Sequence, residues 1–126
     1  MIEQLLEYNR EFVKSGAYEK FQTSKYPDKK IAILTCMDTR LTLLLPAALG
    51  LRNGEVKMVK NAGGVVSSPY DTSVRSLLIA VLELGVEEIM VIGHTDCGVC
   101  GMQPGKLLED LVERGIPESV LRQVGE

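Results

Sequence analysis

A short apolar run that ends abruptly in reactive side chains constrains this chain more than any other feature. Residues 31–34, Ile-Ala-Ile-Leu, follow two lysines and are typical of a strand that is buried on both faces. The chain then carries Cys36, Asp38 and Arg40 at alternate positions. Because side chains alternate in an extended segment, we expect this thiol, carboxylate and guanidinium to lie on the same side of it.

A second apolar run ends in a similar way. Residues 88–92 are predicted to form a strand, and His94 and Cys97 follow it closely. Together with Cys36, they offer two thiolates and one imidazole, a ligand set that suits zinc. Three protein ligands leave the fourth position of the tetrahedron open, as in catalytic sites. The sequence therefore predicts a zinc site formed by Cys36, His94 and Cys97.

Strands and helices alternate along the chain, which predicts an α/β fold with a parallel β-sheet flanked by helices. The predicted strands are 31–34, 56–59 and 88–92, and the predicted helices are 2–14, 41–49, one that is capped within 71–73 and ends at Gly85, 106–114, and a last one that starts at Pro117. The expected strand order is 2-1-3, with a crevice at the carboxyl ends of the first and third strands. Those ends carry Cys36 and His94. The N-terminal helix precedes the first strand, so we expect it to pack outside the sheet or on a partner subunit.

The apolar pattern also predicts which elements are buried. The helix 41–49 is apolar on all sides and is expected to be buried, with Pro46 causing a kink or a late start. The strand 88–92 is expected to be covered on both faces. One helix should present four large residues to the core, namely Val74, Leu77, Leu78 and Val81.

Composition narrows the classes of function. The chain has 126 residues, enough for one domain, and a net charge of -3 without a basic cluster, so no nucleic-acid or membrane partner is expected. No apolar run approaches the length of a bilayer span, and the acidic start does not resemble an export signal. Three cysteines beside a single histidine favour metal binding or thiol chemistry in a reducing compartment. We therefore expect a cytoplasmic protein.

Three motifs together resemble the β-class carbonic anhydrases. They are Cys36-x-Asp38-x-Arg40, Lys60-Asn61-Ala62-Gly63 and His94-x-x-Cys97-Gly98. The resemblance covers Ile2 to about Gly115 and is greatest to the small archaeal-type branch. It implies that Cys36, His94 and Cys97 bind zinc and that Asp38 and Arg40 form a catalytic dyad, which orients zinc-bound hydroxide. The implied reaction is the reversible hydration of carbon dioxide to bicarbonate and a proton, in a homodimer or a higher homo-oligomer.

Two departures from the family pattern keep alternatives open. Members of the family continue to a further strand beside residues 88–92, whereas this chain stops at Glu126, so the domain 1–126 is expected to be short at its C-terminus. Cys100 creates a Cys97-x-x-Cys100 pair, which can close a Cys3His zinc site, act as a redox pair, or leave Cys100 as a passive thiol.

Three other interpretations follow from these residues. A closed Cys3His site predicts a non-catalytic, zinc-stabilised interaction protein. A site that stays open can also act on carbonyl sulphide or carbon disulphide. Asp38 and Arg40 can form a purely structural ion pair.

Overall fold

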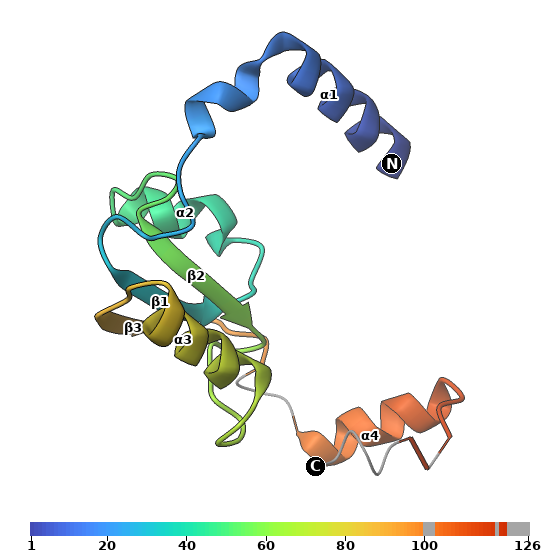
Figure 1. Ribbon diagram of the computed structural model, residues 1–126. Coiled ribbons are helices and arrows are strands. Elements are labelled where there is room, and N and C mark those ends of the chain that lie inside the picture. Colours follow the sequence, from blue (N-terminus) through green and yellow to red (C-terminus); the bar gives the residue numbers. More distant parts are fainter. Residues whose placement is uncertain (100–102, 118, 121–126) are drawn as a thin grey trace. The chain divides into compact units, whose positions relative to one another are not determined.

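The computed structural model describes residues 1–99, 103–117 and 119–120. The chain divides into two compact units, Met1–Ile92 and a second that begins at Gly93. The first unit contains, in order, α1 (Ile2–Ser15), the 3-10 helix η1 (Ala17–Phe21), β1 (Ile31–Cys36), α2 (Leu41–Ala48), β2 (Val56–Asn61), α3 (Thr72–Glu83) and β3 (Glu88–Ile92) (Figure 1). The second contains α4 (Pro104–Glu113). No helix in the described part of the chain combines the length and the apolar character that crossing a bilayer requires.

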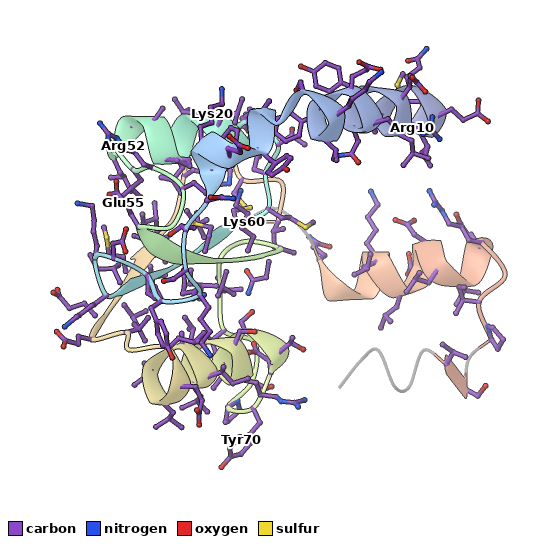
Figure 2. The ribbon with its side chains drawn as sticks, turned by 45° about the horizontal axis from the view of Figure 1, so that its top comes forward. Arg10, Lys20, Arg52, Glu55, Lys60 and Tyr70 are labelled. Atoms are coloured by element: carbon purple, nitrogen blue, oxygen red, sulfur yellow. The ribbon has the colours of Figure 1, made fainter. Side chains whose placement is uncertain are left out.

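The three strands form a parallel sheet in the order β2-β1-β3, which confirms the predicted order. β1 is the central strand, and its residues from Ala32 to Cys36 are buried. Both β1 and β2 extend two residues beyond their predicted ends, and the last pair in their register is Cys36 with Asn61. Figure 2 shows Glu55 at the start of β2 and Lys60 near its carboxyl end. Because both strand pairings are parallel, the carboxyl ends of all three strands lie at one edge of the sheet.

Helix α3 packs against β1 and β2. Its N-cap is Asp71, within the predicted range, and the Asp71 carboxylate accepts a hydrogen bond from the backbone N–H of Val74 at 2.8 Å. The predicted core face is only partly correct, because Leu78 and Val81 are 48% and 43% exposed.

The buried positions of α3 are instead the small residues Ser73 and Ala80. Ala80 forms a core cluster with Ala32 of β1 and with Val86, and Leu77 packs against this cluster. Small side chains at these positions let the helix backbone approach the sheet closely. The prediction assigned the core face of α3 from its large apolar residues, whereas α3 packs on the sheet through the face that carries its small residues.

The predicted burial of α2 is wrong, and β3 is not covered within the described residues of this chain. Helix α2 buries only Leu41 and Leu45, one turn apart, and Leu43 is 82% exposed. A helix of this length that covers one surface buries one stripe, whatever the character of its other residues. The helix also continues through Pro46, so it does not start late. β3 is an edge strand of the sheet, and its residues from Glu88 to Val91 are exposed in the single chain, so cover from a further strand or from a partner subunit stays a prediction.

The terminal helices match their predictions in part. α1 ends at Gly16, which has a φ of 75° as a left-handed C-cap, and none of its residues is buried. The polar segment between α1 and β1 contains η1, and the ring of Phe21 lies 6.2 Å from that of Phe12 in α1. α4 begins with proline, two residues before its predicted start. The helix predicted from Pro117 falls largely outside the described residues.

Candidate metal centre

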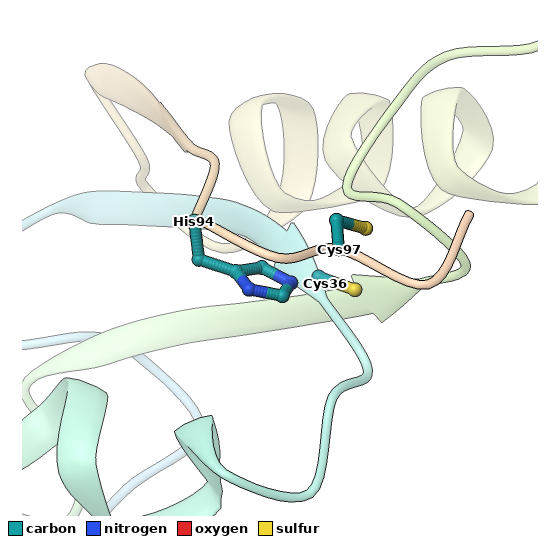
Figure 3. A group of neighbouring side chains, drawn as sticks. All are labelled: Cys36, His94 and Cys97. Carbon is teal, nitrogen blue, oxygen red and sulfur yellow. The ribbon is translucent and has the colours of Figure 1, made fainter. Parts of the chain in front are cut away.

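The three predicted ligands lie close together. Cys36, His94 and Cys97 each offer one ligand atom, and these atoms all lie within 4.8 Å of one another (Figure 3). Cys36 is the last residue of β1 and is 4% exposed, whereas His94 and Cys97 are half-buried. His94 follows the end of β3 by two residues, so parallel pairing of the neighbouring strands places both ligand-bearing segments at one edge of the sheet.

The hydrogen bond of the His94 ring indicates which nitrogen faces a metal ion. Nδ1 lies 2.8 Å from the carbonyl oxygen of Thr95. A carbonyl oxygen can only accept, so Nδ1 donates and the neutral ring keeps its lone pair on Nε2. A backbone carbonyl that fixes the ring in this way is the usual partner of a metal-binding histidine. Two thiolates and an Nε2 donor at these distances therefore fit a zinc ion.

Thr35 joins the two strands that lead to the ligands. Its Oγ1 donates a hydrogen bond of 2.9 Å to the carbonyl oxygen of Ile92, the last residue of β3, and Thr35 is fully buried. This bond lies one residue before Cys36 and two residues before His94. Sequence reasoning missed Thr35, although a hydroxyl residue within an otherwise apolar strand is the signal that could have indicated it.

Asp38 and Arg40 form a two-pronged ion pair. Arg40 Nε donates to Asp38 Oδ1 at 2.9 Å, and Arg40 Nη2 donates to Asp38 Oδ2 at 2.7 Å. The backbone N–H of Arg40 adds a third bond, to Asp38 Oδ1 at 2.8 Å. Such bidentate geometry fixes the plane of the carboxylate. Among the residues that the structure describes, the group of close ligand atoms contains the two cysteines and the histidine but not Asp38.

The path of the chain between these residues differs from the prediction. The segment after Cys36 is not extended; it turns at once into α2, and the N–H of Leu41 donates to the carbonyl of Asp38 at 3.0 Å. The pairing of Asp38 with Arg40 therefore arises from a turn, and the expected alternation of side chains does not apply. Cys100 lies outside the described residues, so its three interpretations stay predictions.

Comparison with known proteins agrees with the motifs. A family model described as carbonic anhydrase matches residues 31–124. The chain is 49% identical to the Bacillus subtilis protein YtiB over 124 residues, which is 98% of this chain and 66% of that protein. It is 34% identical to a carbon disulfide hydrolase from Saccharolobus solfataricus over 95 residues, which is 75% of this chain and 44% of that protein.

A solved structure shares the fold. The crystal structure of β-carbonic anhydrase isoform I from Trichomonas vaginalis has a TM-score of 0.86 and 32% identity, and the match covers 98% of this chain and 68% of that one. The chain spans about two thirds of the length of YtiB and of the Trichomonas vaginalis protein, and 44% of the length of the carbon disulfide hydrolase. From the family match and this shared fold, we conclude that the chain belongs to the β-carbonic anhydrase family.

Proposed function

We propose that this chain binds zinc through Cys36, His94 and Cys97 and catalyses the reversible hydration of carbon dioxide to bicarbonate and a proton. The observation that carries the proposal is the convergence of two sulphurs and one imidazole nitrogen within 4.8 Å at the ends of neighbouring strands. Membership of the β-carbonic anhydrase family supports it, as does the ion pair that follows β1.

The ligand residues and the ion pair have different tasks in this proposal. Zinc, when bound, acts as a Lewis acid that can bring the pKa of water to about 7. Arg40 holds the Asp38 carboxylate in one orientation, and Asp38 accepts the hydrogen of the attacking water, so that an oxygen lone pair faces the substrate. Carbon dioxide is uncharged and offers the protein few polar contacts, so the rate depends on the orientation of the nucleophile more than on the binding of the substrate.

The test combines metal analysis with stopped-flow measurement of carbon dioxide hydration. The parent protein should contain zinc and catalyse the reaction. Asp38→Asn should keep its zinc and lose activity by roughly 10²-fold or more, because the amide no longer offers two equivalent acceptor oxygens. Asp28→Asn, at an exposed aspartate, is the matched control and should keep full activity. Zinc in the parent without hydration would contradict the proposal.

Carbon disulphide is the second candidate substrate. Three of the relatives are carbon disulfide hydrolases, 34%, 33% and 30% identical to this chain. The same ligands and the same carboxylate would serve this reaction, since carbon disulphide is also linear and uncharged. Production of hydrogen sulphide from carbon disulphide, in a preparation that does not hydrate carbon dioxide, would favour this second function. Cys100→Ser separates both activities from the Cys3His alternative, which predicts loss of zinc in this variant.

We further propose that the chain forms a homodimer or a higher homo-oligomer. α1 exposes apolar side chains, including Ile2, Leu5 and Leu6, and β3 exposes Val91 at the edge of the sheet. Exposed apolar surface of this kind marks contact sites. Sedimentation equilibrium should give a molar mass of at least twice that of the chain, and a monomer at all concentrations would contradict this.

Two finer assignments stay predictions. The small archaeal-type branch is one, because the relative of highest identity reported above comes from Bacillus subtilis. A cytoplasmic location is the other, and it rests on the need of the two thiolate ligands for a reducing compartment. Fractionation of the producing cells would test the location.

A further inference from the structure

We propose that the turn 61–65 is a positioning element for Cys36, in which Gly64 and Asn61 fix the place of the Cys36 backbone and hence of its sulphur. This inference rests on the proposed zinc site, since it concerns the ligand that β1 contributes. Lys60-Asn61-Ala62-Gly63 is one of the three motifs of the family resemblance, and the structure indicates which of its atoms, with Gly64, support the site.

Gly64 lies directly against the peptide bond that precedes Cys36. A Cβ atom at Gly64 would lie 2.9 Å from the carbonyl carbon of Thr35 and 3.0 Å from the nitrogen of Cys36. These are backbone atoms of the central, buried strand, so they cannot move aside as the end of a flexible side chain could. Gly64 also has a φ of +64°, a conformation that favours glycine. Any larger residue at Gly64 must therefore displace either the turn or the Cys36 backbone.

Asn61 holds the turn in this position. Its side-chain Nδ2 donates to the carbonyl of Val65 at 2.6 Å and to Oγ of Ser73 at 2.8 Å. Its Oδ1 accepts from the N–H of Val65 at 3.1 Å. One side chain therefore closes the turn and ties it to the buried Ser73 in the first turn of α3. These hydrogen bonds fix the turn, and with it the position of Gly64 against β1.

The backbone on both sides of Cys36 is restrained by this turn. Gly64 contacts the peptide before Cys36, and the carbonyl oxygen of Asn61 accepts a hydrogen bond of 2.8 Å from the N–H of Met37, the next residue. Ligands of a metal site bind best when the protein holds them in place beforehand. The turn thus prepares the Cys36 thiol for the metal without contacting the metal itself.

Two glycine variants test this inference. Both add a side chain at a positive φ, so a difference between them cannot be due to backbone strain alone. Gly64→Ala places a Cβ against β1, whereas Gly50→Ala has nearly the same φ of +66° and no atom within 4 Å of its Cβ. Zinc affinity is measured by competition with a coloured chelator. We expect the dissociation constant to rise by about 10- to 100-fold in Gly64→Ala and to stay near that of the parent in Gly50→Ala. Equal affinities in the two variants would overturn the inference.

A milder variant covers the case in which Gly64→Ala does not fold. Asn61→Asp keeps the acceptor for the N–H of Val65 but replaces the Nδ2 donor by a carboxylate oxygen that repels the carbonyl of Val65, so it loosens the turn without a Cβ against β1. With Co²⁺ in place of zinc, the intensity of the thiolate-to-cobalt charge-transfer band should fall in this variant, which a general loss of stability would not cause in the folded protein. An unchanged spectrum and unchanged zinc affinity in Asn61→Asp would contradict the inference.

A metal-free measurement separates this inference from the proposed function. Trypsin releases Cys36 in a peptide of its own, between Lys30 and Arg40, so mass spectrometry can follow its alkylation alone. The thiol is buried in the parent, and we expect faster alkylation in metal-free Gly64→Ala than in metal-free Gly50→Ala. A parent that binds no zinc but shows this difference would refute only the proposed function. Equal alkylation rates beside a zinc-binding parent would refute only the positioning role.

Discussion

Replacing Thr35 by valine tests how firmly the two ligand-bearing strands are joined. The substitution keeps the branched shape of the side chain and removes the hydroxyl that donates to the carbonyl of Ile92 at 2.9 Å. Because Thr35 is 0% exposed, water cannot replace the lost donor. Leaving a buried acceptor without its donor costs about 1–3 kcal/mol. Burial of the extra methyl group returns about 0.8 kcal/mol. We therefore expect a net loss of about 0.2–2.2 kcal/mol in the free energy of unfolding.

Thermal unfolding of the metal-free protein, followed by circular dichroism, measures this loss. Unfolding entropy at the average value per residue converts it into a fall in Tm of about 1–8 °C for a chain of this length. Thr42→Val, at an exposed position of α2, is the matched control and should change stability by less than about 0.5 kcal/mol. Equal Tm values for the two variants would show that the bond from Thr35 does not join the strands, and would refute the reasoning.

Three further predictions concern the core, a helix cap and proton transfer. Leu34→Ala, at a side chain that is 1% exposed in the central strand, should lower the free energy of unfolding by about 2–5 kcal/mol, as chemical denaturation would measure. The backbone N–H groups of Val74 and Ser67 lower the pKa of Asp71 below its ordinary value of 3.8. Ionised Asp71 therefore stabilises the fold at pH values above 3.8, and this stabilisation is lost as the pH falls through the lowered pKa of Asp71 in the folded state. The difference in Tm between the parent and Asp71→Ala should shrink as the pH is lowered from neutral to about 3. The only histidine in the sequence, His94, is assigned to the metal, so we expect buffer, or water chains past Asp38 or a nearby tyrosine, to carry the proton instead of a second imidazole. A hydration rate that rises with buffer concentration would identify buffer as the carrier, and a rate independent of it would count against buffer.

The sheet and the ligand cluster could be predicted because their signals are local. Each strand is a short apolar run with a clear end, and alternation with helices leaves few arrangements for three strands. The predicted order placed the ends of β1 and β3 side by side, and the structure does bring Cys36, His94 and Cys97 together.

The burial of the helices and the residues that hold the candidate site in place depend on tertiary contacts, which the periodicity of apolar residues in the sequence does not reveal. Apolar character predicted a fully buried α2, but a helix covers only the surface that the fold gives it, and Leu43 faces solvent. Small residues such as Ala80 determine how closely α3 approaches the sheet, although they contribute little to an apolar pattern. Thr35 and Gly64 lie against residues that are distant in the sequence, Ile92 and the Thr35–Cys36 peptide respectively, and the sequence does not specify these neighbours.

X-ray absorption at the zinc edge of the purified protein is the most direct test of the central claim, that Cys36, His94 and Cys97 hold a zinc ion with one position open. The account predicts one zinc per chain, with two sulphur neighbours at about 2.3 Å and nitrogen or oxygen neighbours at about 2.0–2.1 Å. A protein without zinc, or a zinc ion with three sulphur neighbours, would contradict it.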